Sequence, residues 1–205
     1  MKIAQLILFL CLNLFGFSQS DIDKLFKEEV CQKCDFSGAN LSNLDLSTFD
    51  MKYSNFQRAN LSNSNFFMTE LQGSDFNEAN LENTNFWKSN LNFSSFHNTK
   101  AKMANFKGAK FQNSSMQNSD FSYTISWKAD FSHADIDQVN FSYSELGDAI
   151  FLNNNLLNSN LKETILWNTK FQNTKLTKEQ CLHTQKEEAL LKDNKTTCQT
   201  DSKNK

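Results

Sequence analysis

The 205-residue sequence contains no proline and only five glycines. Because proline is the one residue without a backbone N–H, its absence leaves every position able to donate to a hydrogen-bonded ladder. The few glycines form no glycine-rich phosphate loop, and no nucleophile elbow is present. His97, His133 and His183 stand at spacings that match no metal-ligand signature, which favours ordinary surface positions. We therefore expect no catalytic residues, no bound metal and no cofactor, so the chain is not predicted to be an enzyme.

The chain also lacks a large excess of positive or negative charge and a long apolar run. The net charge of −2 indicates neither a polycation nor a polyanion. The apolar run over residues 3–17 is shorter than the ~20 residues that a membrane-spanning helix needs. A lysine before it and small polar residues after it favour a secretory signal peptide over residues 1–20, cleaved after Ser18 or Ser20. We therefore expect an exported protein (periplasmic, cell-surface or secreted) without a stable membrane span after cleavage. A membrane anchor and a lipoprotein site at Cys11 remain open alternatives.

A large apolar residue recurs at every fifth position from residue 36 to residue 176. Of these 29 positions, 27 hold Phe, Leu, Met or Ile, and the exceptions are Ala101 and Ser126. A helix would rotate successive anchors by about 140°, and a flat strand would send them to opposite faces. Neither element keeps the anchors together, so the chain must turn a corner once per repeat.

The other positions of the repeat agree with this geometry. The position two residues before an anchor is mostly small, and the position just before it is mostly Asn or Asp, which bond locally to turn backbone. If each corner is near 90°, four repeats close one coil of 20 residues. Trp87, Trp127 and Trp167 support this number, since each follows an anchor and they are spaced by 40 residues. About seven coils stacked ~4.8 Å apart make a rod roughly 35 Å long.

Three repeats show the consensus most clearly. Residues 39–43 and 59–63 read Ala-Asn-Leu-Ser-Asn, and residues 79–83 read Ala-Asn-Leu-Glu-Asn. They resemble the A(D/N)LXX consensus of the pentapeptide-repeat family, and the resemblance extends over residues 34–178. It implies an all-β fold, a right-handed four-sided parallel β-helix. The family has no common catalytic residues to carry over.

Both ends of such a solenoid need a cover, because an open ladder invites edge-to-edge growth. Residues 21–33 predict an N-terminal cap helix with an apolar side. Thr177 and Gln180 have capping-box spacing, so a second helix is expected to follow the β-helix of residues 34–178. Residues 179–205 would form this C-terminal cap helix and a polar tail. Three leucines are available to cover the last coil: Leu182, Leu190 and Leu191.

The mature chain holds four cysteines, in two widely separated pairs. A four-cysteine zinc site is disfavoured, because the pairs lie at opposite ends of the predicted rod, whereas Zn–S bonds are ~2.3 Å long. In an exported protein, two local disulfides are the better interpretation: Cys31–Cys34 and Cys181–Cys198. Cys34 also occupies a small inward position, so a buried free thiol remains an alternative.

Ser126 interrupts the series of large anchors, and its neighbours Ile125 and Trp127 depart from the usual polar flanks. A close-packed interior does not tolerate a missing side chain without compensation. We therefore predict a local bulge, in which Ile125 or Trp127 fills the space that Ser126 leaves.

One outward position gathers aromatic residues. In a 20-residue register it reads Ser47, Phe67, Trp87, Lys107, Trp127, Gly147 and Trp167. Tyr123 and Tyr143 line the corner that leads onto this face. Exposed aromatic side chains on a rigid face are typical of carbohydrate-binding or protein-binding surfaces. The candidate ligand-binding residues are therefore Phe67, Trp87, Trp127, Trp167, Tyr123 and Tyr143. The alternative is that the rings only stack on one another and stiffen the face.

These features favour a non-catalytic exported scaffold or interaction module, whose partner is an unidentified protein or glycan of the cell envelope. The resemblance supplies an alternative, because some pentapeptide-repeat proteins mimic DNA and protect or inhibit topoisomerases. That role needs a cytoplasmic and strongly acidic rod. Cleavage would leave 20 basic and 23 acidic residues, a charge of −3, with Lys88, Lys107 and Lys128 on the candidate face. No nucleic-acid partner is expected, and a homodimer remains open.

Overall fold

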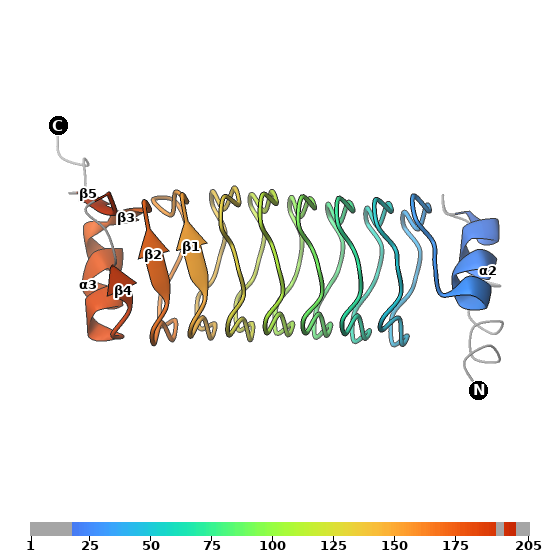
Figure 1. The fold of residues 1–205 in the computed structure, drawn as a ribbon, viewed down its shortest axis with the longest axis horizontal. Coiled ribbons are helices and arrows are strands. Elements are labelled where there is room, and N and C mark those ends of the chain that lie inside the picture. Colours follow the sequence, from blue (N-terminus) through green and yellow to red (C-terminus); the bar gives the residue numbers. More distant parts are fainter. Residues whose placement is uncertain (1–17, 192–194, 200–205) are drawn as a thin grey trace.

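The computed structural model describes residues 18–191 and 195–199. The predicted signal peptide lies outside these residues, apart from its last three positions. The regular elements are α2 (Gln19–Glu28), β1 (Ile150–Leu152), β2 (Lys170–Gln172), β3 (Lys175–Thr177), α3 (Lys178–Lys186), β4 (Leu190–Leu191) and β5 (Thr197–Gln199). Between α2 and β1 the chain winds through a long stack of similar coils, which gives an elongated rod with α2 at one end and α3 at the other (Figure 1).

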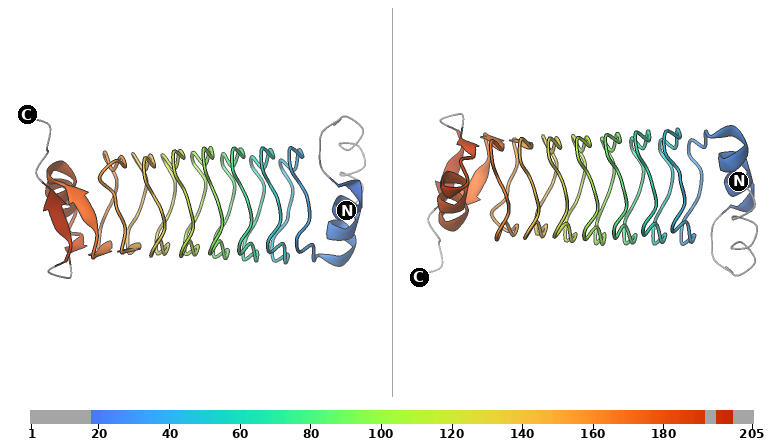
Figure 2. Two further views of the ribbon diagram at one scale, coloured as in Figure 1. Left: turned by 90° about the horizontal axis from the view of Figure 1, so that it is seen from above. Right: turned by 90° about the horizontal axis from the view of Figure 1, so that it is seen from below.

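Each coil pairs in parallel with the coil 20 residues further along the chain. Asn40 pairs with Asn60, which pairs with Asn80, and β1 and β2 continue the same offset. Each of two neighbouring coils donates hydrogen bonds to the other. The Phe36 N–H donates to Asn55 O (2.8 Å), and the Asn55 N–H donates to Cys34 O (2.9 Å). Most pairings involve one residue on each coil, because the chain turns soon after every pair, and the views from above and below show these turns along the stack (Figure 2). The predicted coil of four repeats is confirmed.

The corners use the turn residues that the repeat supplies. The second residue after each anchor has a positive φ at nearly every corner, as at Asn43 (60°) and Asn63 (59°). Asparagine tolerates this left-handed conformation better than most residues. The residue before the anchor closes the same turn, since Asn60 Oδ1 accepts from Ser62 N–H at 3.2 Å. Local side-chain bonding therefore fixes each corner.

The anchors fill the interior as stacks of rings. Phe56 and Phe76 stack with centroids 4.9 Å apart, and Phe66 and Phe86 do the same on the opposite side of the coil. In the C-terminal half the phenylalanine stacks occupy the other two sides. The longest of these runs through Phe111, Phe131, Phe151 and Phe171. This exchange of sides keeps the interior close-packed along the rod.

The predicted bulge at Ser126 is wrong. Ser126 is fully buried in a regular coil, and its N–H donates to Glu145 O at 2.7 Å as in the neighbouring repeats. The ring of Phe121 supplies the missing volume, because it stacks on Phe106 at 5.1 Å, where an anchor ring at position 126 would otherwise lie. Ile125 stays on the surface instead, 40% exposed.

Helix α2 covers the N-terminal end of the stack. Ile22 and Leu25 are buried in the same core as the anchors. The rings of Phe26 and Phe49 pack edge-to-face, with their centroids 6.5 Å apart. This contact explains why Phe49 is large, since the position two residues before an anchor is mostly small. The helix begins at Gln19 and is capped by the Ser18 side chain, two residues before the predicted boundary, and it ends at Glu28 rather than near residue 33.

Helix α3 covers the opposite end. The predicted capping box is present between Thr177 and Gln180. The Gln180 Nε2 group also donates to the carbonyl oxygens of Leu156 and Ser159, both at 2.8 Å. The helix thus supplies donors to carbonyl oxygens that a further coil would otherwise bond. Leu182 does not cover the last coil and is 60% exposed, because the capping box turns Cys181 and Thr184 inward instead.

Candidate functional site

The four predicted positions on one face follow the anchors Phe66, Phe86, Ser126 and Leu166, and we call this face the aromatic wall. Its outward rings are Phe67, Trp87, Trp127 and Trp167. Trp87 and Trp167 are 38% and 51% exposed, whereas Phe67 and Trp127 are half-buried. The 20-residue ladder places them in one column, because equivalent positions of successive coils lie above one another.

The N-terminal part of the aromatic wall is a ring pair. Phe67 and Trp87 lie with centroids 5.1 Å apart and planes tilted by 52°. The Lys88 ammonium lies 5.3 Å from the Trp87 ring centroid, a distance at which the ring quadrupole attracts a cation. This part of the wall therefore combines an aromatic surface with a positive charge.

The C-terminal part depends on a glycine. Trp127 lies against Gly147, and its ring reaches Trp167 at 6.2 Å although the two residues are two coils apart. The Trp127 Nε1–H donates to Glu145 Oε2 at 2.7 Å, which fixes the ring in this position. The absence of a side chain at Gly147 thus allows two tryptophans to form one surface.

The two tyrosines form a stack on the adjoining corner. The Tyr123 and Tyr143 rings are 5.0 Å apart and nearly parallel, at 12°, and both are exposed. The Lys102 ammonium lies 5.2 Å from the Tyr123 ring centroid. The structure therefore places this tyrosine pair outside the column of the wall, as predicted for a corner.

Two apolar residues that the sequence interpretation does not include extend the wall. Ile125 and Ile165 are 40% and 44% exposed, and each lies two residues before a wall tryptophan. Their sequence signal is an aliphatic residue at a position that normally holds Asn or Asp. A shallow hollow lies beside Trp127, and its lining residues are Lys107, Ile125, Trp127, Lys128, Glu145 and Asp148.

Exposed aromatic residues also occur away from the aromatic wall. Tyr53 and Phe93 are well exposed, and Tyr53 lies against Gly73 much as Trp127 lies against Gly147. Exposure alone therefore does not distinguish the wall. What distinguishes it is the number of rings gathered on one face, together with Ile125 and Ile165.

An ion pair links neighbouring coils on the surface of the rod. The clearest interaction is Arg58 with Glu78 on the coil above, with Nε–Oε2 and Nη2–Oε1 distances of 3.0 and 3.3 Å. These hydrogen bonds and the guanidinium charge lower the pKa of Glu78, and the same hydrogen bonds and the carboxylate charge raise the pKa of Arg58. Both side chains are exposed, so this pair is a surface contact between coils.

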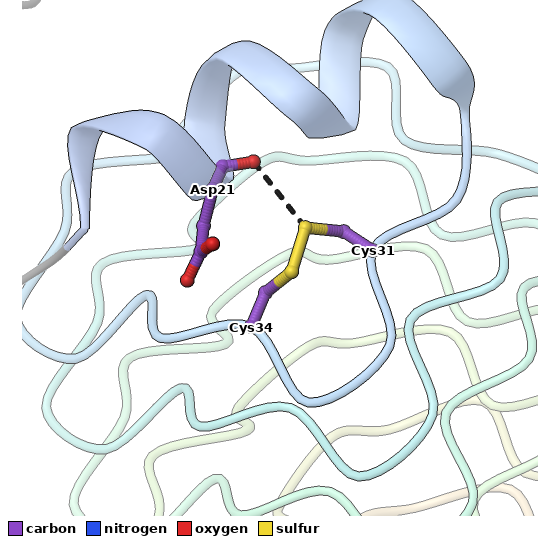
Figure 3. A group of neighbouring side chains, drawn as sticks. All are labelled: Asp21, Cys31 and Cys34. Atoms are coloured by element: carbon purple, nitrogen blue, oxygen red, sulfur yellow. Dashed lines mark hydrogen bonds between the residues drawn. A yellow bond between two sulfur atoms is a disulfide. The ribbon is translucent and has the colours of Figure 1, made fainter.

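The cysteines lie in two pairs at opposite ends of the rod. Cys31 and Cys34 are bonded to each other beside Asp21 at the N-terminal end (Figure 3), and Cys181 and Cys198 are bonded at the other end. The pairing is the one that the sequence favours. The ligand atoms of Asp21, Cys31 and Cys34 lie within 4.8 Å of one another. The disulfide removes both thiolates, which are the groups that would bind a metal.

The repeat identifies the family of the chain. The family model described as "Pentapeptide repeats (8 copies)" matches five overlapping or adjacent segments: residues 31–66, 69–102, 89–125, 114–153 and 140–177. The chain belongs to the pentapeptide-repeat family. A comparison with curated protein sequences gives no significant match. In the part of the chain that the structure describes, we find no helix with the length and apolarity to cross a membrane.

Solved structures of other pentapeptide-repeat proteins are similar to this chain. A trypsin-treated variant of QnrB1, a plasmid-mediated fluoroquinolone resistance protein, is 21% identical with a TM-score of 0.53, over 84% of this chain and 80% of that one. HetL from the cyanobacterium Nostoc sp. strain PCC 7120, involved in heterocyst differentiation regulation, is 18% identical, with a TM-score of 0.32 and coverage of 80% and 86%. Rfr23 from the cyanobacterium Cyanothece 51142 is also 18% identical, with a TM-score of 0.39 and coverage of 72% and 97%. At this identity the likeness to QnrB1 supports the right-handed four-sided β-helix and nothing about function.

Proposed function

We propose that this pentapeptide-repeat protein is an exported, non-catalytic scaffold that binds a protein or glycan of the cell envelope through its aromatic wall. The observation that carries the proposal is the gathering of Trp87, Trp127 and Trp167 on one face, joined by Ile125 and Ile165. Tryptophan and other aromatic side chains are enriched at the centres of binding surfaces, because each buries a large apolar area at a small cost in rotamer entropy.

The rod supports this role by holding the rings in place before a partner arrives. Phe66 and Phe86, the anchors beneath Phe67 and Trp87, are fully buried and stacked. Gly147 and Glu145 fix the Trp127 ring from below and from the side. A surface that is ordered in advance loses less conformational entropy on binding, so more of the contact energy contributes to affinity.

The cysteines support export. Two disulfides are typical of proteins that fold in an oxidising compartment, whereas cytosolic thiols are kept reduced. The N-terminal apolar run supplies the matching signal peptide. N-terminal sequencing of the exported protein tests this part directly, and a mature chain that retains residues 1–17 contradicts it.

The alternative function, mimicry of DNA toward a topoisomerase, needs negative charge along the rod. Residues 83–119 contain lysines but no aspartate or glutamate, so the centre of this rod carries the opposite sign. The structural likeness to QnrB1 concerns the fold, and it does not bring that protein's role to this chain. Retention of the full-length protein in the cytoplasm would favour the alternative.

The test is affinity capture from envelope extracts with the full chain and with a Trp87→Ala/Trp127→Ala/Trp167→Ala variant. A Tyr53→Ala/Phe93→Ala variant is the matched control, because it removes exposed rings from other parts of the surface. We expect the wild type and the control to retain the same partner and the triple variant to lose it while melting normally. Equal capture by all three proteins overturns the proposal. Light scattering on the same samples shows whether the partner is a second copy of the chain.

A further inference from the structure

The charges of the rod are segregated along its length. Residues 83–119 carry five lysines and no carboxylate: Lys88, Lys100, Lys102, Lys107 and Lys110. The preceding residues end in Glu82, and the following ones begin with Asp120. The middle of the rod is therefore a basic belt between two segments that contain the carboxylates, although the net charge of the chain is close to zero.

The positive charge of this belt is available to a ligand. All five lysines are exposed. Among the described residues, the ion pairs within 4 Å join Lys52 to Asp50 and Glu70, and Arg58 to Glu78, and none involves the belt. Lys100 and Lys110 stand in register with Asp120 and Asp130 of the next coil, whereas the positions in register with Lys88 and Lys107 hold no carboxylate. Exposed lysines of this second kind attract anions over about one Debye length, ~8–10 Å at physiological salt.

The belt crosses the aromatic wall, where cations and rings alternate. The outward residues of four successive coils on this wall lie in the ranges 65–68, 85–88, 105–108 and 125–128. They include Lys88, Lys107 and Lys128 but no carboxylate. Along the column, Lys107 lies between Trp87 and Trp127, and it shares the hollow beside Trp127 with Lys128.

Two carboxylates also line this hollow, and both accept hydrogen bonds from the protein. Glu145 accepts from the Trp127 indole, and Asp148 accepts from the Asn168 side-chain amide. These contacts hold both acids against the protein, whereas Lys107 and Lys128 have no anionic partner among the described residues. The hollow thus holds two ammonium groups, without an ion pair in the described part of the chain, next to an indole ring, and its two carboxylates are engaged in hydrogen bonds within the protein.

The orientation of the rings indicates the kind of ligand. The Trp127 ring packs against Gly147, and the Lys88 ammonium lies over the Trp87 ring, so the protein itself covers one face of each ring. A sugar ring needs only one aromatic face, against which its C–H groups pack.

Side-chain amides stand in the same column, where the Nδ2 groups of Asn85 and Asn105 each have a second N–H beyond the one that the ladder uses. The side-chain amides of Asn65, Asn85 and Asn105 form a ladder, in which Asn85 Nδ2 donates to Asn65 Oδ1 (2.8 Å) and Asn105 Nδ2 donates to Asn85 Oδ1 (3.1 Å). An amide repeated on each coil, at the spacing of the ladder, suits a linear polymer of repeated units.

We propose that the partner of the aromatic wall is an acidic polysaccharide. Its sugar rings pack on Trp87 and Trp127, and a sugar carboxylate lies between the ammonium groups of Lys107 and Lys128, where charge-assisted hydrogen bonds form. This inference rests on the proposed function, since it names the class of glycan that the aromatic wall binds.

Binding of the full chain to immobilised polygalacturonate tests the proposal, with dextran as the neutral glycan. We expect binding to polygalacturonate that weakens as salt is raised, and no binding to dextran. Lys107→Gln/Lys128→Gln should lower the affinity roughly tenfold or more. Lys24→Gln/Lys162→Gln is the matched control, because it removes the same charge from exposed sites off the wall and should leave binding unchanged.

Three results overturn the proposal. Equal loss in both lysine variants would show a response to net charge and not to a site. Tighter binding to oligo-dT or to poly-glutamate than to polygalacturonate would assign the wall to a nucleic acid or an acidic peptide. Absence of polygalacturonate binding, while the tryptophan variant still loses its envelope partner, would refute the acidic glycan and leave the proposed function intact.

Discussion

The indole ring of Trp127 occupies the space that a side chain at Gly147 would take. A Cβ placed on Gly147 would lie 2.2 Å from the nearest ring carbon, far inside contact distance. Because Gly147 does not have a positive φ, alanine is compatible with its backbone. The glycine is therefore needed for the position of the tryptophan and not for the conformation of the coil.

Gly147→Ala should accordingly displace Trp127 while the rod stays folded. The overpacked ring loses its hydrogen bond to Glu145, and we expect a cost of about 1–3 kcal/mol. Tryptophan emission should shift to the red and become easier to quench with iodide. In a Trp127→Phe background the same substitution should leave the emission unchanged. An unaltered spectrum in the Trp127 protein would mean that the ring does not lie where the structure places it.

Phe121 and Ser126 should be energetically coupled. Phe121→Ala removes the ring that stacks on Phe106 and should cost ~3–5 kcal/mol. Ser126→Phe alone adds a ring to occupied space and should cost ~1–3 kcal/mol. The double variant should lose less than the sum, since the new ring restores a stack over Phe106. Urea denaturation of the four proteins measures the coupling, and additive losses would contradict this account of the core.

Two buried serines at equivalent positions should respond differently to alanine. Ser74 Oγ donates to Met51 O at 3.1 Å and accepts from Ser54 N–H at 3.2 Å. Ser114 Oγ has no hydrogen-bond partner among the described residues. Ser74→Ala leaves two buried groups unpaired and should cost ~1–3 kcal/mol, whereas Ser114→Ala should be neutral or slightly stabilising. Thermal melts of the two variants check the order, and equal losses would argue against the bonding pattern.

The two disulfides should contribute unequally to stability. Cys181–Cys198 closes a loop of sequence separation 17, and Cys31–Cys34 closes one of only 3. The chain-entropy model then assigns about 3 kcal/mol to the first and about 2 kcal/mol to the second. Cys181→Ala/Cys198→Ala should therefore lower the unfolding midpoint more than Cys31→Ala/Cys34→Ala. The opposite order would show that packing of the N-terminal end, and not loop closure, dominates.

The sequence alone determined the coil. A period of five rules out helix and flat strand, and the Asn or Asp before each anchor closes a turn through a local bond, as Asn60 does with Ser62. The offset of 20 residues, the inward anchors and the capping box at Thr177 then follow, because each depends on neighbours in sequence or on simple repetition. The aromatic column could be predicted for the same reason, since the register places equivalent residues above one another.

How individual side chains fill the space between coils depends on contacts that the repeat pattern does not specify. Phe121 leans over Phe106 beside Ser126, and Trp127 crosses Gly147 to reach Trp167. Such contacts depend on rotamers chosen against residues 15 to 40 positions away, and a period fixes where a Cα lies but not where its ring points. The exposure of Leu182 has the same kind of cause, because the capping box and the buried Cys181 set which face of α3 points away from the last coil.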